Sequence, residues 1–179
     1  RGSQDSNWWF DNSTLEVYGT QYPFRNAAAY FQNGSTYVGN ATTSYILRDN
    51  SVVYVDATSK LNAPYATVTA ANHTIDYAKG AAVMLKSGPV NEMQVEVYTN
   101  GRLSGVYATV ADAEAAVKAG KVNQCVIVSG DYTTTGIPDV GCELLIRGGS
   151  FAEPPANLEG DYTAVLENGK WVVRKNIDV

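Results

Sequence analysis

Histidine and cysteine, the side chains that most often carry nucleophilic or metal chemistry, are scarce in this chain. His73 is the only histidine, and Cys125 and Cys142 are the only cysteines. A Ser-His-Asp or Cys-His mechanism would have to use His73, which follows Asn72 in a predicted turn, where a solvated side chain needs no partner. One histidine and two separated cysteines also lack the clustered ligand spacing of a zinc site. We therefore predict no catalytic residue, no metal site and no cofactor.

Carboxylates are the remaining route to an enzyme, because many enzymes that cleave polysaccharides use acidic groups, some of them with calcium. Asp131, Asp139 and Glu143 are near one another in the sequence, but Asp131 and Asp139 lie in predicted turns, where aspartate is favoured in any case. The sequence contains no calcium-loop pattern of alternating aspartates. We expect that the chain is not an enzyme.

The two cysteines could still act as a pair. Cys125 begins the apolar run Cys125-Val126-Ile127-Val128, and Cys142 shortly precedes Leu144-Leu145-Ile146. If these runs are adjacent strands, the cysteines would form a disulfide in an oxidising compartment or pack as two small buried side chains in a reducing one. The sequence leaves both states open.

Aromatic residues are concentrated near the N-terminus. Asn7-Trp8-Trp9-Phe10 places three aromatic rings within four residues, and Trp171 lies in an apolar run near the other end. Such rings could fill the end of a β core, offer a platform on which sugars stack, or lie buried at a contact between subunits. Trp8, Trp9 and Trp171 are the candidate contact or sugar-stacking residues.

One short helix is predicted between Thr109 and Gly120. The Thr109 hydroxyl and the Asp112 carboxylate have the spacing that satisfies the first free amides of a helix. Gly120 can adopt the left-handed conformation that closes the last turn. The apolar residues between them recur at helical spacing, at Val110, Ala113, Ala116 and Val117. We expect a helix near residues 110 to 119 that packs on the next two strands.

The region after this helix resembles a known family. A capped helix, a strand that ends in Ser129-Gly130-Asp131-Tyr132, a threonine-rich bend and Leu145-Ile146-Arg147-Gly148-Gly149 resemble the beginning of a pectin-lyase-like right-handed parallel β-helix. In that family a helix covers the open end of the coil. The tail, through Trp171-Val172-Val173, is similar to the final coil of repeat-rich surface proteins of gut-dwelling bacteria. The resemblance covers the chain from Thr109 onward and implies a fold and a setting, not an activity.

Short β-prone runs separated by Asn, Asp, Gly and Ser fill the sequence from Tyr22 to Lys86. Four turn residues precede such runs, namely Asn12, Gly34, Asn50 and Asn72. Their offsets of about 22, 16 and 22 residues are near the length of one β-helix coil but irregular. The turns at Asp49-Asn50 and Ala71-Asn72 could equally open hairpins. We predict a mainly β protein, a parallel β-helix or solenoid with one short capping helix. The alternative is a β-sandwich with a small α+β domain.

Two hairpins and one boundary are predicted in the second half. Asn100-Gly101 and Asn168-Gly169 are two-residue turns, each between β-prone runs. Lys86-Ser87-Gly88-Pro89 combines a flexible residue with one that cannot donate to a sheet. The predicted domains are a β-rich region at 1–88 and a region at 89–179 with a hairpin, the helix and β coils.

Composition limits the function. The chain is 45% hydrophobic and 17% charged, with a formal net charge of -5 and twelve tyrosines. The excess of acidic residues argues against nucleic-acid binding, which requires a basic surface. The sequence contains no apolar run long enough to span a membrane. A β-rich chain with few charges to protect its sheet edges is expected to self-associate.

These observations favour a non-enzymatic extracellular structural or adhesive module. It could be part of a cell-surface protein, a filament subunit or part of a virion fibre, working as a homo-oligomer or within a larger surface assembly. The alternative is a carbohydrate-binding module with a glycan ligand, and an enzyme that cleaves glycans is the third candidate.

Overall fold

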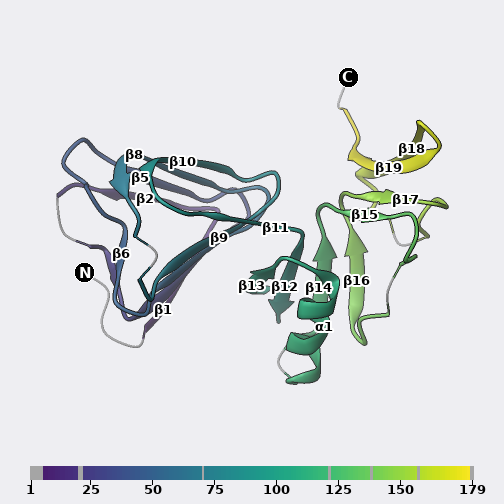
Figure 1. Cartoon of the computed structure of the whole chain (residues 1–179), viewed down its shortest axis with the longest axis horizontal. Helices are drawn as coiled ribbons and strands as arrows, with labels where there is room; N and C mark the ends of the chain where they lie inside the picture. Colours follow the sequence, from purple (N-terminus) through teal and green to yellow (C-terminus); the bar gives the residue numbers. More distant parts are fainter. Residues whose placement is uncertain are drawn as a thin grey trace. The chain divides into compact units, whose positions relative to one another are not determined.

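The computed structural model describes residues 6–19, 22–69, 71–120, 122–137, 139–156 and 158–177. These residues are mainly β, with a single helix among them (Figure 1). The chain divides into two compact units, Arg1–Glu92 and Met93–Val179. The division falls a few residues after the predicted boundary at 88.

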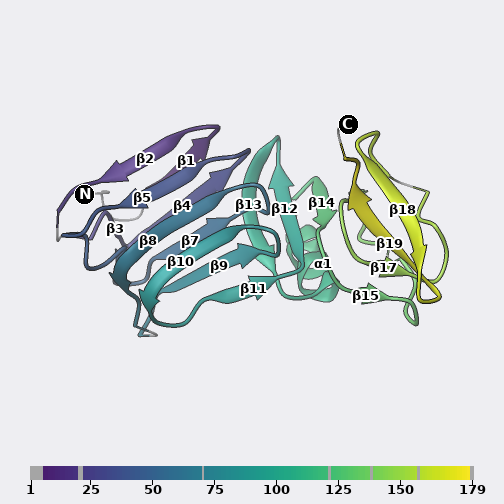
Figure 2. The ribbon, with the colours of Figure 1, turned by 90° about the horizontal axis from the view of Figure 1, so that it is seen from above.

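Three sheets build the N-terminal unit (Figure 2). The five-stranded sheet has the order β1 (Ser6–Asp11), β4 (Ala27–Gln32), β7 (Val52–Val55), β9 (Thr74–Ala78) and β11 (Asn91–Met93). The four-stranded sheet has the order β10 (Ala82–Ser87), β8 (Lys60–Thr67), β5 (Thr36–Gly39) and β2 (Thr14–Val17). The two-stranded sheet pairs β3 (Phe24–Arg25) with β6 (Leu47–Arg48). The chain visits these sheets in turn, so that successive coils stack.

The stacking of coils confirms the predicted parallel β-solenoid. Strand β7 pairs in parallel with both β4 and β9, so Ala29, Val53 and Ile75 lie side by side in three successive coils. A sandwich is wrong for this unit, because a sandwich is built from antiparallel strands. The turn at Asp49-Asn50 is a corner of the coil, not a hairpin, because β6 and β7 belong to different sheets.

Asparagine occupies two corners of the coil in the left-handed conformation, which this short polar residue tolerates. Asn12 and Asn33 follow β1 and β4, with φ values of 48° and 53°. Asn26, Asn50 and Asn72 precede β4, β7 and β9, with φ values of 46°, 41° and 49°. The turn residues have irregular spacing in the sequence because Asn12 belongs to the first corner, whereas Asn50 and Asn72 belong to the second.

The core of the N-terminal unit lies inside the coils. Alternate side chains of β4 and β7 are fully buried, as in Ala29, Phe31, Val53 and Val55. The Phe10 and Phe31 rings stack with centroids 4.7 Å apart. Alternation with a period of two thus separates an apolar inner row from an outer row on each face.

A four-stranded sheet and the helix begin the C-terminal unit. The sheet has the order β13 (Arg102–Tyr107), β12 (Val95–Thr99), β14 (Gln124–Ile127) and β16 (Glu143–Ile146). Helix α1 (Val110–Lys118) follows β13. The Thr109 hydroxyl accepts a hydrogen bond from the Asp112 amide at 3.2 Å, and Gly120 has φ +87°. Both helix ends are therefore as predicted.

The helix lies mainly against β12 and β13, the hairpin that precedes it. Its apolar residues also share one core with Cys125 and Ile127 of β14 and Ile146 of β16, so the helix packs on the preceding hairpin as well as beside the two strands that the sequence predicts. Only Ala108 and Thr109 separate β13 from α1, and so short a connection folds the helix back onto the hairpin that precedes it.

No helix in the described ranges is long and apolar enough to cross a membrane.

A second sheet completes the C-terminal unit, in the order β15 (Asp131–Tyr132), β17 (Ser150–Phe151), β19 (Lys170–Lys175) and β18 (Tyr162–Glu167). The parallel pairs β14–β16 and β15–β17 form a coil step like those of the other unit. Both predicted hairpins are confirmed, since β12–β13 and β18–β19 are antiparallel and turn at Asn100-Gly101 and Asn168-Gly169.

Candidate functional site

A pocket of about 340 Å³ lies at a corner of the N-terminal unit. Its walls come from Tyr22 before β3, from the segment around β6 and from the end of β8 together with the segment before β9. We call it the tyrosine-arginine pocket, after the residues that give it its character: Tyr22, Tyr45, Arg48, Asp49, Thr69 and His73.

Two stacked tyrosines form one wall. The Tyr22 and Tyr45 rings have centroids 5.0 Å apart and an interplanar angle of 30°. Each tyrosine precedes a strand of the two-stranded sheet by two residues, and Phe24 pairs with Leu47 in that sheet. Repetition of the coil therefore brings the two rings together. Tyr45 is 39% exposed, so part of its ring faces solvent.

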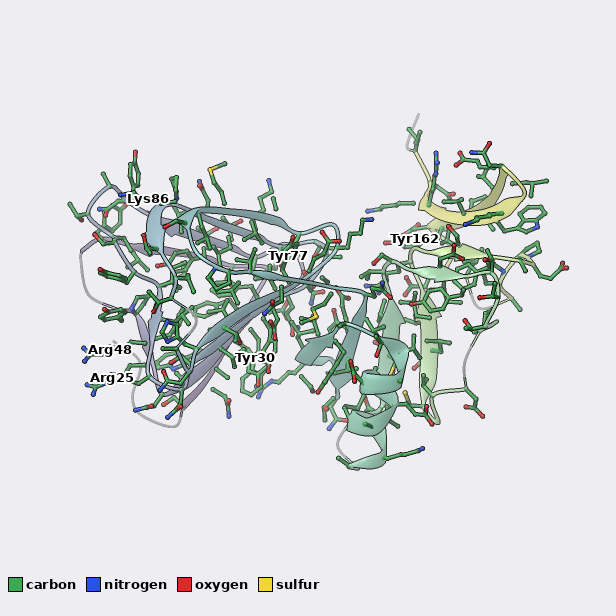
Figure 3. The ribbon with its side chains drawn as sticks, viewed as in Figure 1. Arg25, Tyr30, Arg48, Tyr77, Lys86 and Tyr162 are labelled. Carbon is green, nitrogen blue, oxygen red and sulfur yellow. The ribbon has the colours of Figure 1, made fainter. Side chains whose placement is uncertain are left out.

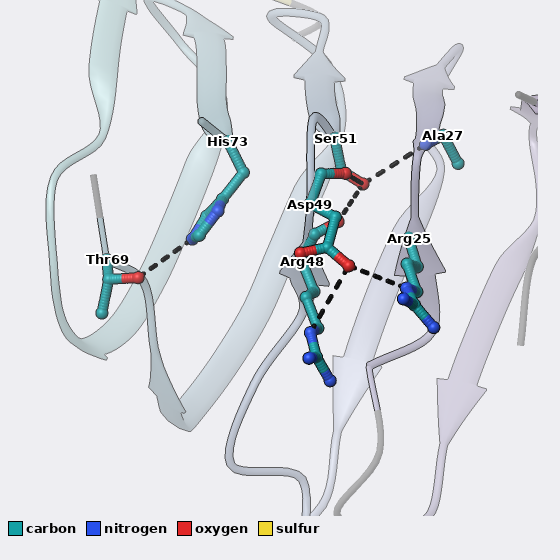
Figure 4. Close-up of polar contacts among 7 residues, drawn as sticks. All are labelled: Arg25, Ala27, Arg48, Asp49, Ser51, Thr69 and His73. Carbon is teal, nitrogen blue, oxygen red and sulfur yellow. Dashed lines mark hydrogen bonds and ion pairs between the residues drawn. The ribbon is translucent and has the colours of Figure 1, made fainter. Parts of the chain in front are cut away.

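An arginine pair surrounds one carboxylate beside these rings (Figure 4). The Asp49 Oδ2 atom lies 2.8 Å from Arg25 Nε and 3.5 Å from Arg48 Nε. The Arg48 guanidinium also lies 5.4 Å from the centroid of the Tyr22 ring, a cation–π contact. Figure 3 shows Arg25 and Arg48 reaching outward at the same corner of the unit. Arg48 and Asp49 line the pocket and Arg25 lies outside its lining, so the three groups together carry one net positive charge beside the pocket.

His73 forms part of the polar wall. Its Nε2 atom lies 3.1 Å from Thr69 Oγ1 (Figure 4). Its Nδ1 atom is buried and has no hydrogen-bond partner among the residues that the structure describes. His73 lies in a turn as predicted, but it is only partly exposed and contacts Thr69, whereas the sequence predicts a solvated side chain without a partner. A buried nitrogen without a partner is costly unless a ligand or water satisfies it.

The predicted aromatic residues do not form one row. Neighbours in a strand point to opposite sides, so Trp8 lies in the inner row with Ala29, and Trp9 lies on the outer face with Tyr30. Trp8 is 39% exposed. Trp9 stacks on Tyr30 with centroids 4.9 Å apart. Trp171 belongs to β19 and packs against the core of the C-terminal unit.

The stacking of Trp9 continues along the outer face. Tyr30 stacks in turn on Tyr54, with centroids 5.1 Å apart and an interplanar angle of 26°. Sugar stacking requires an open ring face, and the faces of Tyr30 are covered by its two neighbours. This row ties coils together and is a poor sugar platform.

The structure brings the two cysteines together. The sulfur atoms of Cys125 and Cys142 lie 3.2 Å apart, and both residues are thiols. Cys125 is fully buried in β14, and Cys142 is partly exposed directly before β16. Burial, and next the neighbouring Cys142, raise the pKa of Cys125 to about 12.

The predicted carboxylates have separate surroundings. Asp131 lies 2.6 Å from Lys170 Nζ, and this hydrogen bond, followed by those from Thr133, holds the pKa of Asp131 below its usual range. Asp139 accepts a hydrogen bond from the Gly141 amide within its own turn. Glu143 and Asp139 line a wider and more open hollow of about 700 Å³. No cluster of metal-ligating side chains occurs in the described part of the chain.

Sequence reasoning missed the tyrosine-arginine pocket. The available signal was the recurrence of Tyr22-x-Phe24 and Tyr45-x-Leu47 one coil apart. Comparison with family models, with characterised proteins and with solved structures finds no match for this chain. The resemblance to pectin-lyase-like β-helices therefore stays a prediction.

Proposed function

We propose that this chain is a non-enzymatic structural or adhesive module of an extracellular surface, as in a surface protein, a filament or a virion fibre. The observation that carries the proposal is the use of buried polar groups in the N-terminal unit. They bind one coil to the next, whereas catalytic groups converge on a substrate cavity.

A column of serines shows this use. The Ser13 amide donates to Ser35 Oγ, and the Ser35 amide donates to Ser59 Oγ, each at 3.1 Å. The Ser35 hydroxyl lies 2.8 Å from the Phe10 carbonyl of the preceding coil and 2.7 Å from the Gln32 carbonyl of its own coil. The same residue type in three successive coils satisfies backbone groups at one corner, where the sheets are interrupted.

Asp56 anchors the same corner. It is only 2% exposed, and its Oδ2 atom accepts from the Asn33 amide of the preceding coil at 2.9 Å. Its Oδ1 atom accepts from the Thr58 amide and from the Ser59 hydroxyl. A buried carboxylate whose oxygens are used in this way supports the fold and is not offered to a substrate.

Retention on glycan-bearing surfaces, measured together with product release, tests this proposal. Beads that carry the chain are applied to surfaces coated with extracellular polysaccharides, and the liquid is assayed for new reducing ends and unsaturated sugars. Beads that carry heat-unfolded chain are the control. We expect folded chain to be retained without product, or to self-associate in light scattering. Steady product release would contradict the proposal, as would a monomer that no surface retains.

A further inference from the structure

We propose that the tyrosine-arginine pocket binds an acidic sugar, a unit whose carboxylate pairs with Arg48 and whose ring packs on Tyr45. The inference rests on the adhesive form of the proposed function, and it adds the site and the class of ligand. The pocket volume of about 340 Å³ lies at the lower end of the range for small-molecule sites, about 300 to 1,000 Å³. A site of this size suits one sugar unit with its neighbours outside.

The charge of the pocket selects an anion. Arg48 and Asp49 are the charged residues that line the pocket, and Arg25, outside the lining, pairs with Asp49 at 2.8 Å, closer than Arg48 at 3.5 Å. Arg25 therefore offsets the charge of Asp49, and the charge of Arg48 remains for a ligand. The Arg48 Nε atom faces Asp49 at 3.5 Å. Its two terminal nitrogens have no hydrogen-bond partner within the described ranges. That end of a guanidinium matches a carboxylate, which it binds with two parallel hydrogen bonds.

The position of Arg48 is prepared before any ligand arrives. Asp49 holds its Nε edge, and the Tyr22 ring lies under its guanidinium plane at 5.4 Å. These contacts reduce the number of rotamers that binding would have to freeze, and less lost freedom means tighter binding.

Aromatic and polar groups complete the recognition of a sugar. Tyr22 is engaged by both Tyr45 and Arg48, which leaves the exposed Tyr45 ring for the C–H face of the ligand. On the polar wall, the Thr69 hydroxyl and His73 Nε2 lie 3.1 Å apart at the surface, and a hydroxyl can both donate to and accept from the hydroxyl of a sugar. An apolar ring face, a guanidinium group and a polar wall in one pocket are the groups that an acidic sugar requires.

Calorimetric titration of the full chain with matched oligosaccharides tests the inference. The acidic probes are sialyllactose and glucuronate oligosaccharides, and the neutral probes are lactose and glucose oligosaccharides of the same length. Inorganic sulfate is added as a simple anion. We expect binding of at least one acidic probe, with the neutral probes at least tenfold weaker. Equal binding of acidic and neutral probes, binding of sulfate as tight as that of the sugar, or no binding of any acidic probe would overturn the inference.

Three variants within the pocket and one control outside it locate the site. Arg48→Gln should weaken the binding of the acidic probe at least tenfold. Tyr45→Ala should weaken the binding of acidic and neutral probes alike. Lys60→Gln removes an exposed cation of β8 outside the pocket and should change nothing. Arg48→Lys keeps the charge but lacks the planar guanidinium group, so it should bind the acidic probe with intermediate affinity. This variant preserves the test if Arg48→Gln folds poorly. If beads that carry Arg48→Gln adhere as well as beads that carry the wild-type chain, the inferred acidic-sugar site is overturned and the adhesive role is not.

Discussion

Cys125 and Cys142 hold their sulfur atoms 3.2 Å apart across the parallel pair β14–β16. Cys125 pairs with Leu144 in that sheet, so Cys142, two residues earlier, lies at the edge of the same core. The coil step of the C-terminal unit thus positions two thiols that the sequence separates.

We predict that oxidised glutathione converts this pair to a disulfide. A buried thiol with a raised pKa reacts slowly, so the oxidant should react first at the partly exposed Cys142, and Cys125 then displaces glutathione. Two protons and two electrons leave the protein and two glutathione thiols form. The bond should stabilise the unit by about 3 kcal/mol. Mass spectrometry and thermal melting measure both effects, with Cys142→Ser as the control, and an unchanged mass after oxidation would refute the prediction.

Gly120→Val should destabilise the C-terminal unit by about 1 to 2 kcal/mol or more, because a β-branched residue is strained at φ +87°. No atom would meet the added Cβ within 4 Å, so the cost is conformational and not a clash. Gly120→Asn is the matched control, since asparagine tolerates this conformation. Chemical unfolding should rank the two variants, and equal stability would mean that the helix does not end here in solution.

Asp56→Ala should destabilise the N-terminal unit by about 2 kcal/mol or more, because the Asn33 amide and the Ser59 hydroxyl lose their buried acceptor. Asp11→Ala removes the corresponding but exposed carboxylate of the first coil, which accepts from the Asn33 side chain and from no other side chain that the structure describes. Its effect should stay within about 0.5 kcal/mol. Denaturant midpoints compare the two variants, and equal losses would show that the corner column carries little stability.

Acid should weaken the C-terminal unit through Glu159. Arg147 donates to both carboxylate oxygens, at 2.7 Å and 3.1 Å, and this pairing lowers the pKa of Glu159 below its ordinary 4.5. A group with a lowered folded pKa contributes stability above its unfolded pKa and loses it as the pH falls through the folded pKa. Glu159→Gln should therefore cost about 1 kcal/mol at pH 7, and this cost should shrink as the pH falls below 4.5 and vanish once Glu159 is protonated in the folded chain. Melting curves across pH measure this, with exposed Glu153→Gln as the control, and a loss that persists in acid would contradict it.

Self-association should depend on Trp8. The strands β1 and β2 form edges of their sheets, and Trp8, on β1, is 39% exposed. Light scattering over a range of concentrations should show oligomers that Trp8→Ser reduces and that Trp8→Ser/Trp9→Ser reduces further. Tyr65→Ser, which removes an exposed ring of the inner strand β8, is the control. A monomer at every concentration, with Trp8 and Trp9 freely quenched, would refute the assembly.

Local chemistry in the sequence predicts much of the C-terminal unit. Thr109, Gly120 and the two Asn-Gly turns act within a few residues, and each is found where the sequence places it. The period of the apolar residues likewise predicts a mainly β chain. These features need no distant partner, so neighbouring residues suffice to specify them.

Only the tertiary structure decides which residues meet across coils. Asn26 and Asn50 look like Asn12 and Asn33 in the sequence, yet they occupy a different corner, because each corner is set by the register of stacked strands. In the same way, the pairing of β3 with β6 brings Tyr22 to Tyr45. It also lets Arg25 and Arg48 share Asp49. Strands of two residues are too short to be recognised in the sequence. The sequence alone determined the mainly β character, the single helix and the two Asn-Gly turns. The candidate site depends on contacts between coils, which form only when the chain closes each coil upon the last.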